Sequence, residues 1–267
     1  MAIKFLDVKY KDIFENLNLE INKNEITSVV GKNGSGKTAF LNLIYGLDQN
    51  FEGKIMVGRK SITSNTKKKE VGDVRLNITY LIQEYQNHLF NINILEDIKR
   101  GIDGIDIDKL GELLKLFGLN EEILKRGYFE LSDGEKKKVL IIKMFVRNSK
   151  VILMDDPTSG LDQKSIETLI KLLKKEKRKE KIIVIASQDS EFLMKVSDRI
   201  FIIDNKKIVT NESKQELFCN KIKLYSCGLN MPNVSEFRQK VLNKKGVKLV
   251  YRDNINDLLK DVYRNVK

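Results

Sequence analysis

The sequence predicts an α/β fold organised around a phosphate-binding loop, and three stretches support this prediction. Residues 31–38 read Gly-Lys-Asn-Gly-Ser-Gly-Lys-Thr and match G-x-x-x-x-G-K-[ST], between strand-like apolar residues and helically spaced ones. Residues 151–154 form an apolar run that ends in two carboxylates, and residues 182–185 form a second apolar run. Short apolar runs of this kind are typical of buried strands.

The overall composition is that of a globular protein. The chain has 267 residues, 41% of them hydrophobic and 32% charged, which allows a large core and excludes a disordered chain. We expect no signal peptide, because strand-like residues follow Met1 at once, and no membrane-spanning helix, because no apolar run reaches about 18 residues. Cys219 and Cys227 lack metal-site spacing and read as reduced thiols.

The net charge of +12 suggests an acidic partner such as a nucleotide, a nucleic acid or an anionic lipid. Much of this charge lies in two runs, residues 67–69 and 171–181, that read as solvated faces. No aromatic residues interleave with these runs, as a surface that stacks on bases requires, so we expect no nucleic-acid partner.

The loop at residues 31–38 has the residue types that phosphate binding needs. Gly31, Gly34 and Gly36 let the backbone turn tightly and bring its N–H groups close to phosphate oxygens. The following helix adds its positive N-terminal end. Lys37 can reach the β- and γ-phosphates of a nucleotide, and the Thr38 hydroxyl can ligate Mg²⁺.

Polar residues at two strand ends add to this site. Asp155 and Asp156 follow the apolar run at residues 151–154, where one carboxylate can hold Mg²⁺ through water and the next can orient or deprotonate a water. Gln83 follows a strand at residues 78–82 and could reach Mg²⁺ or the attacking water. The single histidine, His88, reads as a surface loop residue and cannot supply a zinc site or a catalytic triad.

Two further candidate residues stand at the starts of predicted helices. Ser132 is placed to cap the helix that follows it, and an exposed helix N-terminus with Ser and Gly is an anion site. Asp162 is placed to cap the next helix.

Tyr10 could stack on an adenine ring, although alone it is an ordinary sheet residue. Strand-like segments are expected at residues 3–21, 53–58, 199–204 and 207–210. Residues 59–75 are expected to form a surface loop or a variable excursion, and residues 92–145 a helical insertion.

Taken in order, these stretches resemble the nucleotide-binding domain of an ABC-type ATPase. LSDGE at residues 131–135 resembles the family's signature motif, usually LSGGQ, and MDDPTSGLD at residues 154–162 resembles its Walker B and D-loop run, usually ending DEPTSGLD. The resemblance implies a P-loop NTPase core with an antiparallel β subdomain in residues 1–215, a helical subdomain at about 91–146, and a C-terminal extension in residues 216–267 for partner or dimer contact.

The resemblance also implies a mechanism. Two such domains pack head to tail, and each ATP lies between the phosphate loop of one chain and the signature motif of the other. The residues implied to bind ATP are Tyr10, Gly31, Asn33, Gly34, Ser35, Gly36, Lys37, Thr38, Ser132, Gly134 and Asp162. Those implied for Mg²⁺ are Thr38, Gln83 and Asp155, and those implied for catalysis are Asp156, Gln188 and Gln83. The resemblance implies that Ser132 and Gly134 touch the γ-phosphate bound by the partner chain, and that Asp162 crosses the dimer interface.

Three positions depart from the family pattern. Asp156 stands where the family usually has a glutamate, so its carboxylate lies one methylene short. Gln188 stands where a histidine is usual and cannot carry charge near neutral pH. Asp133 replaces the first glycine of the signature motif. These departures lead to the hypothesis of an asymmetric heterodimer in which this chain supplies the slow site, and a homodimer with two slow, working sites is the alternative.

The C-terminal residues resemble those of the ATPase subunits of energy-coupling-factor transporters. The step Gly228-Leu229-Asn230-Met231-Pro232 precedes a helix-like stretch, and residues 255–259 form a last short helix. This implies a peripheral protein on the cytoplasmic side of the cell membrane, with a transmembrane coupling subunit and a substrate-binding membrane subunit as partners. Another ABC transporter type, a non-transport ABC ATPase and a non-hydrolysing ATP sensor remain as alternatives.

Overall fold

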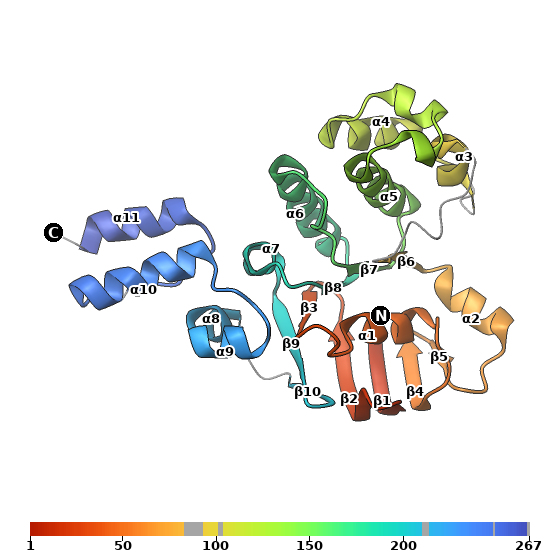
Figure 1. The fold of residues 1–267 in the computed structure, drawn as a ribbon. Coiled ribbons are helices and arrows are strands. Elements are labelled where there is room, and N and C mark those ends of the chain that lie inside the picture. The colour runs from red at the N-terminus through yellow and green to blue at the C-terminus, as the bar shows by residue number, and fades with distance from the viewer. Residues whose placement is uncertain (83–92, 101–103, 210–213, 248, 266–267) are drawn as a thin grey trace.

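The chain folds into two sheets with helices between and around them, which confirms the predicted α/β class (Figure 1). The computed structural model describes residues 1–82, 93–100, 104–209, 214–247 and 249–265. Within these ranges, no helix has the length and apolar character needed to cross a bilayer.

The first sheet is antiparallel and has the strand order β2-β1-β4-β5. Its strands are β1 (Ala2–Tyr10), β2 (Phe14–Asn22), β4 (Glu52–Val57) and β5 (Lys60–Ile62). Apolar residues alternate along β1, where Ile3, Phe5 and Val8 are buried and Lys4 is exposed. This alternation is the pattern of a sheet with one face on the core.

The second sheet is mixed and has the order β10-β9-β3-β8-β7-β6. Its strands are β3 (Ile26–Val30), β6 (Ile78–Leu81), β7 (Val151–Asp155), β8 (Ile182–Ala186), β9 (Arg199–Asp204) and β10 (Lys207–Val209). All pairs are parallel except β9 with β10. The carboxyl ends of β3, β7 and β8 therefore meet at one edge, where α/β sheets bind their ligands.

Helix α1 (Lys37–Tyr45) lies between the two sheets and joins their core. The ring of Phe40 stacks on that of Phe5 from β1, with 4.9 Å between ring centroids, and both side chains are buried. This packing fixes the start of α1, and with it the loop that follows β3.

A group of helices forms a separate lobe above the sheets in Figure 1. It contains α3 (Ile94–Lys99), α4 (Ile107–Leu116), the short 3₁₀ helices at Glu121–Lys125 and Tyr128–Glu130, and α5 (Asp133–Arg147). Inside it, Asp97 accepts hydrogen bonds from the buried Tyr128 hydroxyl at 2.8 Å and from Lys143 Nζ at 2.6 Å. Helices α6 (Gln163–Lys177) and α7 (Ser190–Val196) follow β7 and β8.

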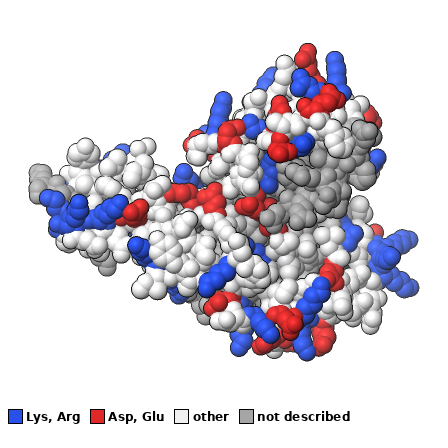
Figure 2. All heavy atoms as spheres, viewed as in Figure 1, with Lys and Arg blue, Asp and Glu red and all other residues white. Residues whose placement is uncertain are grey.

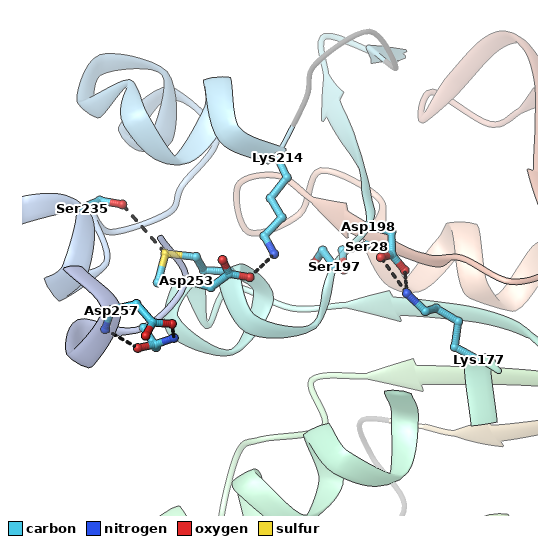
Figure 3. A network of polar contacts seen from close by, with 10 residues as sticks. Ser28, Lys177, Ser197, Asp198, Lys214, Ser235, Asp253 and Asp257 are labelled. Carbon is cyan, nitrogen blue, oxygen red and sulfur yellow. Dashed lines mark hydrogen bonds and ion pairs between the residues drawn. The ribbon is translucent and has the colours of Figure 1, made fainter. Parts of the chain in front are cut away.

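Four helices follow the second sheet and lie beside α7 and β9. They are α8 (Lys214–Cys219), α9 (Lys221–Ser226), α10 (Asn233–Lys245) and α11 (Ile255–Asn265). Polar contacts hold them to each other and to the core, as Figure 3 shows. Lys214 pairs with Asp253 at 2.9 Å, and the Ser235 hydroxyl lies 3.8 Å from the Met194 sulfur of α7.

One prediction of secondary structure from the sequence is wrong. Residues 59–75, expected to be a surface loop, contain β5 and helix α2 (Lys68–Arg75), because Val71 and Val74 bury one side of that helix. Basic side chains gather over α2 at the right of Figure 2, where Lys68 and Lys69 are exposed.

Candidate nucleotide site

A cavity of about 320 Å³ opens at the carboxyl edge of the second sheet. It is lined by residues of the phosphate loop and α1, of the end of β7, and of the segment after β8: Asn33, Gly34, Gly36, Lys37, Thr38, Ala39, Asp155, Asp156, Ala186, Ser187 and Gln188. The parallel register of β3, β7 and β8 brings these distant segments together. A larger hollow of about 560 Å³, beside Met1 and Lys150, contains none of the candidate residues.

Two glycines shape the loop by close approach. A Cβ atom on Gly31 would collide with the Ser35 hydroxyl and would lie 2.8 Å from the main-chain oxygen of Ile203. Gly36 has φ 108° and would meet the Ile13 side chain. Both positions therefore need glycine, and a glycine-rich loop of this kind can turn its backbone N–H groups toward an anion.

Lys37 is held across the loop from which it extends. Its Nζ donates to the main-chain oxygens of Gly31 at 2.8 Å and Lys32 at 2.9 Å. Burial lowers the pKa of this amino group, while the Asp155 and Asp156 carboxylates oppose that shift. The ammonium group thus lies at the loop, placed to meet a phosphate charge.

Asp155 supplies a buried carboxylate with an unused oxygen. The residue is 3% exposed, and its Oδ2 has no hydrogen-bond partner among the described residues. Burial raises the pKa of this carboxyl, and a hydrogen bond from Thr38 works against that increase. An orphaned carboxylate oxygen next to a hydroxyl is the donor set that Mg²⁺ prefers, so these two residues fit the ion. Ser35 Oγ is likewise buried without a partner in the described chain.

Asp156 and Gln188 complete the cavity wall. Asp156 adopts φ 45°, a left-handed conformation that is rare for a non-glycine residue, and its N–H donates to the main-chain oxygen of Ala186 at 2.8 Å. Its own main-chain oxygen accepts a hydrogen bond from Lys137 Nζ at 3.0 Å. Gln188 Nε2 donates to the Gly31 oxygen at 3.0 Å. Asp156 and Gln188 therefore share one cavity with the phosphate loop.

The signature and D-loop residues lie outside this cavity. The Ser132 hydroxyl caps α5 and forms a capping box with Glu135, as the sequence predicted for the cap. Asp162 caps α6 through the Ser165 N–H at 2.8 Å, and it pairs with Lys138 at 2.6 Å. Ser132 and Asp162 are exposed, and neither they nor Gly134 line the cavity.

Two further predicted site residues are not placed at this cavity. Tyr10 is 5% exposed, Lys11 lies over its ring, and its hydroxyl donates to Asp48 at 2.7 Å, so the ring has no open face on which a base could stack. The stacking role expected for Tyr10 is not supported by this geometry. Gln83, together with His88, lies outside the described residues.

One residue near the site was not singled out from the sequence. Lys137 is 4% exposed, and burial lowers the pKa of its amino group. The signal was present in the spacing, because Lys137 precedes Ile141 and Phe145 by four and eight residues and so falls on the apolar stripe of α5.

Comparisons with known proteins match this arrangement. A family model described as "ABC transporter" matches residues 14–159. The energy-coupling factor transporter ATP-binding protein EcfA2 of Streptococcus agalactiae serotype Ia is 28% identical over 265 residues, covering 93% of this chain and 94% of that one.

Two solved structures have similar folds. The structure of cbiO1 from Clostridium perfringens, described as part of the ABC transporter complex cbiONQ, has a TM-score of 0.69 at 24% identity and covers 91% of this chain and 95% of its own. The dimeric structure of MJ0796, a bacterial ABC transporter cassette, has a TM-score of 0.70 at 25% identity and covers 79% and 98%.

Proposed function

This chain belongs to the ABC transporter family of ATP-binding subunits, and on that premise we propose that it binds and hydrolyses ATP to drive an energy-coupling-factor uptake transporter for a vitamin or a metal ion. The observation that carries the proposal is the separation of two sets of residues. The phosphate loop lines a cavity, whereas Ser132 and Gly134 begin a helix outside that cavity, where a second chain can use them.

Each of the main cavity residues has a distinct role toward a bound nucleotide. Lys37 and the loop N–H groups bind the phosphates, and Thr38 and Asp155 hold Mg²⁺, which when bound polarises phosphoryl oxygens. Asp156 orients a water and accepts its proton, and Gln188 positions the phosphate loop and the terminal phosphate. Because the Asp156 carboxylate is one methylene short, turnover at this site is slow.

The second ATPase subunit is a copy of this chain or a paralogue, packed head to tail. The similar cassette MJ0796 is dimeric in its solved structure, which supports such an assembly. In a heterodimer, this chain supplies the slow site, because Asp156 and Gln188 belong to its own cavity. In a homodimer, both sites turn over slowly.

A hollow beside β6 supports a membrane partner. It has a volume of about 270 Å³ and is lined by residues of β6 and α5, among them Tyr80, Leu140 and Met144. Charged residues, Lys143 and Arg147 among them, lie beside these in the lining. A groove with both apolar and charged residues suits an amphipathic helix of a transmembrane subunit. We place this chain on the cytoplasmic side of the membrane, where it binds the coupling subunit and, through it, the substrate-binding subunit.

A mixing experiment tests the shared site. Lys37→Ala removes the side chain that contacts the phosphates, and Ser132→Arg places a large side chain at the start of α5, where the signature motif lies. If each ATP is bound between two chains, an equal mixture regains turnover above that of either variant alone, because one intact site forms in the mixed dimer. No recovery, with an active wild type, contradicts the proposal.

Two further measurements separate the alternatives. Co-extraction with membrane proteins in mild detergent distinguishes a transporter subunit from a non-transport ATPase. Measurable ATP turnover distinguishes it from a non-hydrolysing ATP sensor.

A further inference from the structure

Lys137 connects the signature helix to the candidate catalytic carboxylate. Its Nζ donates to the main-chain oxygen of Asp156 at 3.0 Å, and its side chain is almost completely buried. Lys137 lies on α5, which begins at Asp133, one turn before it. The contact therefore runs from the helix of the signature motif to the end of β7.

The backbone of Asp156 is held from both sides. Its N–H is bonded to Ala186 of β8 at 2.8 Å, and its oxygen is bonded to Lys137. Its φ of 45° is costly for a residue with a Cβ and persists only when the surroundings enforce it. Because the carboxylate is short, the position of this backbone decides whether it reaches a water at the phosphate.

Two neighbouring contacts keep α5 in place. Lys138 pairs with Asp162 at 2.6 Å, and a Cβ on Gly134 would lie 3.2 Å from the main-chain oxygen of Gly160. The first turns of α5 thus bond to the segment 156–162 through Lys137 and Lys138 and approach it closely at Gly134. The Lys137 bond is the one made to a residue that lines the cavity.

We propose that Lys137 is a positioning residue for ATP hydrolysis. It holds Asp156 in its left-handed conformation, so that the direction of the Asp156 carboxylate depends on the position of α5, the helix that begins in the signature motif. The inference rests on the proposed ATPase function for its kinetic consequence. Its structural consequence, the order of the segment 154–162, is independent of that function.

The test compares Lys137→Met with a matched control. Methionine keeps the side-chain volume and removes the donor. Lys109 serves as the control, because its side chain is partly buried and its Nζ likewise donates to a main-chain oxygen, that of Phe145, at 2.6 Å, away from the cavity. Lys109→Met therefore reports the general effect of losing a buried lysine contact.

Two measurements decide the outcome. In Lys137→Met, amide hydrogen exchange in residues 154–162 should accelerate about tenfold without nucleotide, and kcat should fall about tenfold with KM for Mg²⁺-ATP within about twofold. Lys109→Met should leave both unchanged. Unchanged exchange in Lys137→Met overturns the inference, as does an equal loss of kcat in both variants. A wild-type chain that neither binds nor turns over ATP counts against the proposed function, while the exchange result still decides the role of Lys137.

Discussion

Lys37 and Gln188 donate hydrogen bonds to the same acceptor, the main-chain oxygen of Gly31, at 2.8 and 3.0 Å. Lys37 extends from the loop itself, whereas Gln188 follows β8, so this shared oxygen joins the phosphate loop to the neighbouring strand end. Glutamine stays neutral, and the link therefore does not titrate near neutral pH.

Removing the Gln188 amide should loosen the phosphate loop. We expect Gln188→Ala to weaken ATP binding about three- to tenfold, which corresponds to one lost hydrogen bond of about 1 kcal/mol. Equilibrium titration with a fluorescent ATP analogue measures this change. Gln163→Ala, at an exposed position on α6, is the control and should bind ATP like the wild type. Equal affinity in Gln188→Ala would show that the contact does not support the loop.

Lengthening the Asp156 side chain should speed hydrolysis. Asp156→Glu restores the methylene that the family usually has, and we expect kcat to rise by about ten- to a hundredfold, because a displacement of about 1 Å can cost that much. Asp156→Asn should abolish turnover and leave ATP binding intact. Steady-state phosphate release measures both variants, with Asp204→Glu on the exposed end of β9 as the control. A rate for Asp156→Glu at or below that of the wild type contradicts the assigned role.

A contact between the C-terminal extension and the phosphate loop should affect ATP binding. Gly228 has φ 75°, and a Cβ there would lie 3.1 Å from Lys32 Cα. Gly246 has φ 67° and would meet nothing within 4 Å. Both Gly→Ala changes impose a backbone penalty of about 1 kcal/mol, but only Gly228→Ala should also displace Lys32 and weaken ATP binding. Calorimetric titration of the two variants shows the difference, and equal ATP affinities would contradict the contact's role.

The Asp162 cap should make stability depend on pH. Lys138 and the Ser165 N–H lower the pKa of the Asp162 carboxyl to about 2. A lowered pKa means that the ionised form stabilises the fold above the ordinary value of about 4, and that this stabilisation is lost as the pH falls toward about 2. The side chain is about half exposed, so the ion pair adds little and the cap contributes about 1 kcal/mol.

We therefore expect Asp162→Ala to lower the free energy of unfolding by about 1 kcal/mol at pH 7 and by less at pH 3. Urea denaturation at the two pH values measures this difference. A loss that is the same at both values would show that the charge of Asp162 has no part in the stabilisation.

Much of the core could be predicted from sequence because its signals are local. The apolar runs at residues 151–154 and 182–185 became β7 and β8, and the glycines and Lys37 came together in one loop. Ser132 and Asp162 cap α5 and α6 as their positions indicated. The α2 helix was missed because only Val71 and Val74 mark its buried side within a lysine-rich stretch.

The contacts that cross the structure could not be predicted in the same way. Tyr10 has the residue type of a base-stacking platform, but the side chain is buried by tertiary packing and Lys11 lies over its ring. The bond between Lys137 and Asp156 joins residues 19 apart in the sequence and depends on how α5 packs against β7. The approach of Gly228 to Lys32 likewise depends on where the extension folds back on the core.

The most direct measurement is ATP turnover by the wild-type chain and by Lys37→Ala at saturating Mg²⁺-ATP. The account predicts slow turnover in the wild type that Lys37→Ala abolishes, together with ATP binding that the variant weakens strongly. Turnover that is equal in both proteins, or ATP binding that does not depend on Lys37, would contradict the assignment of the phosphate-loop cavity as the ATP site.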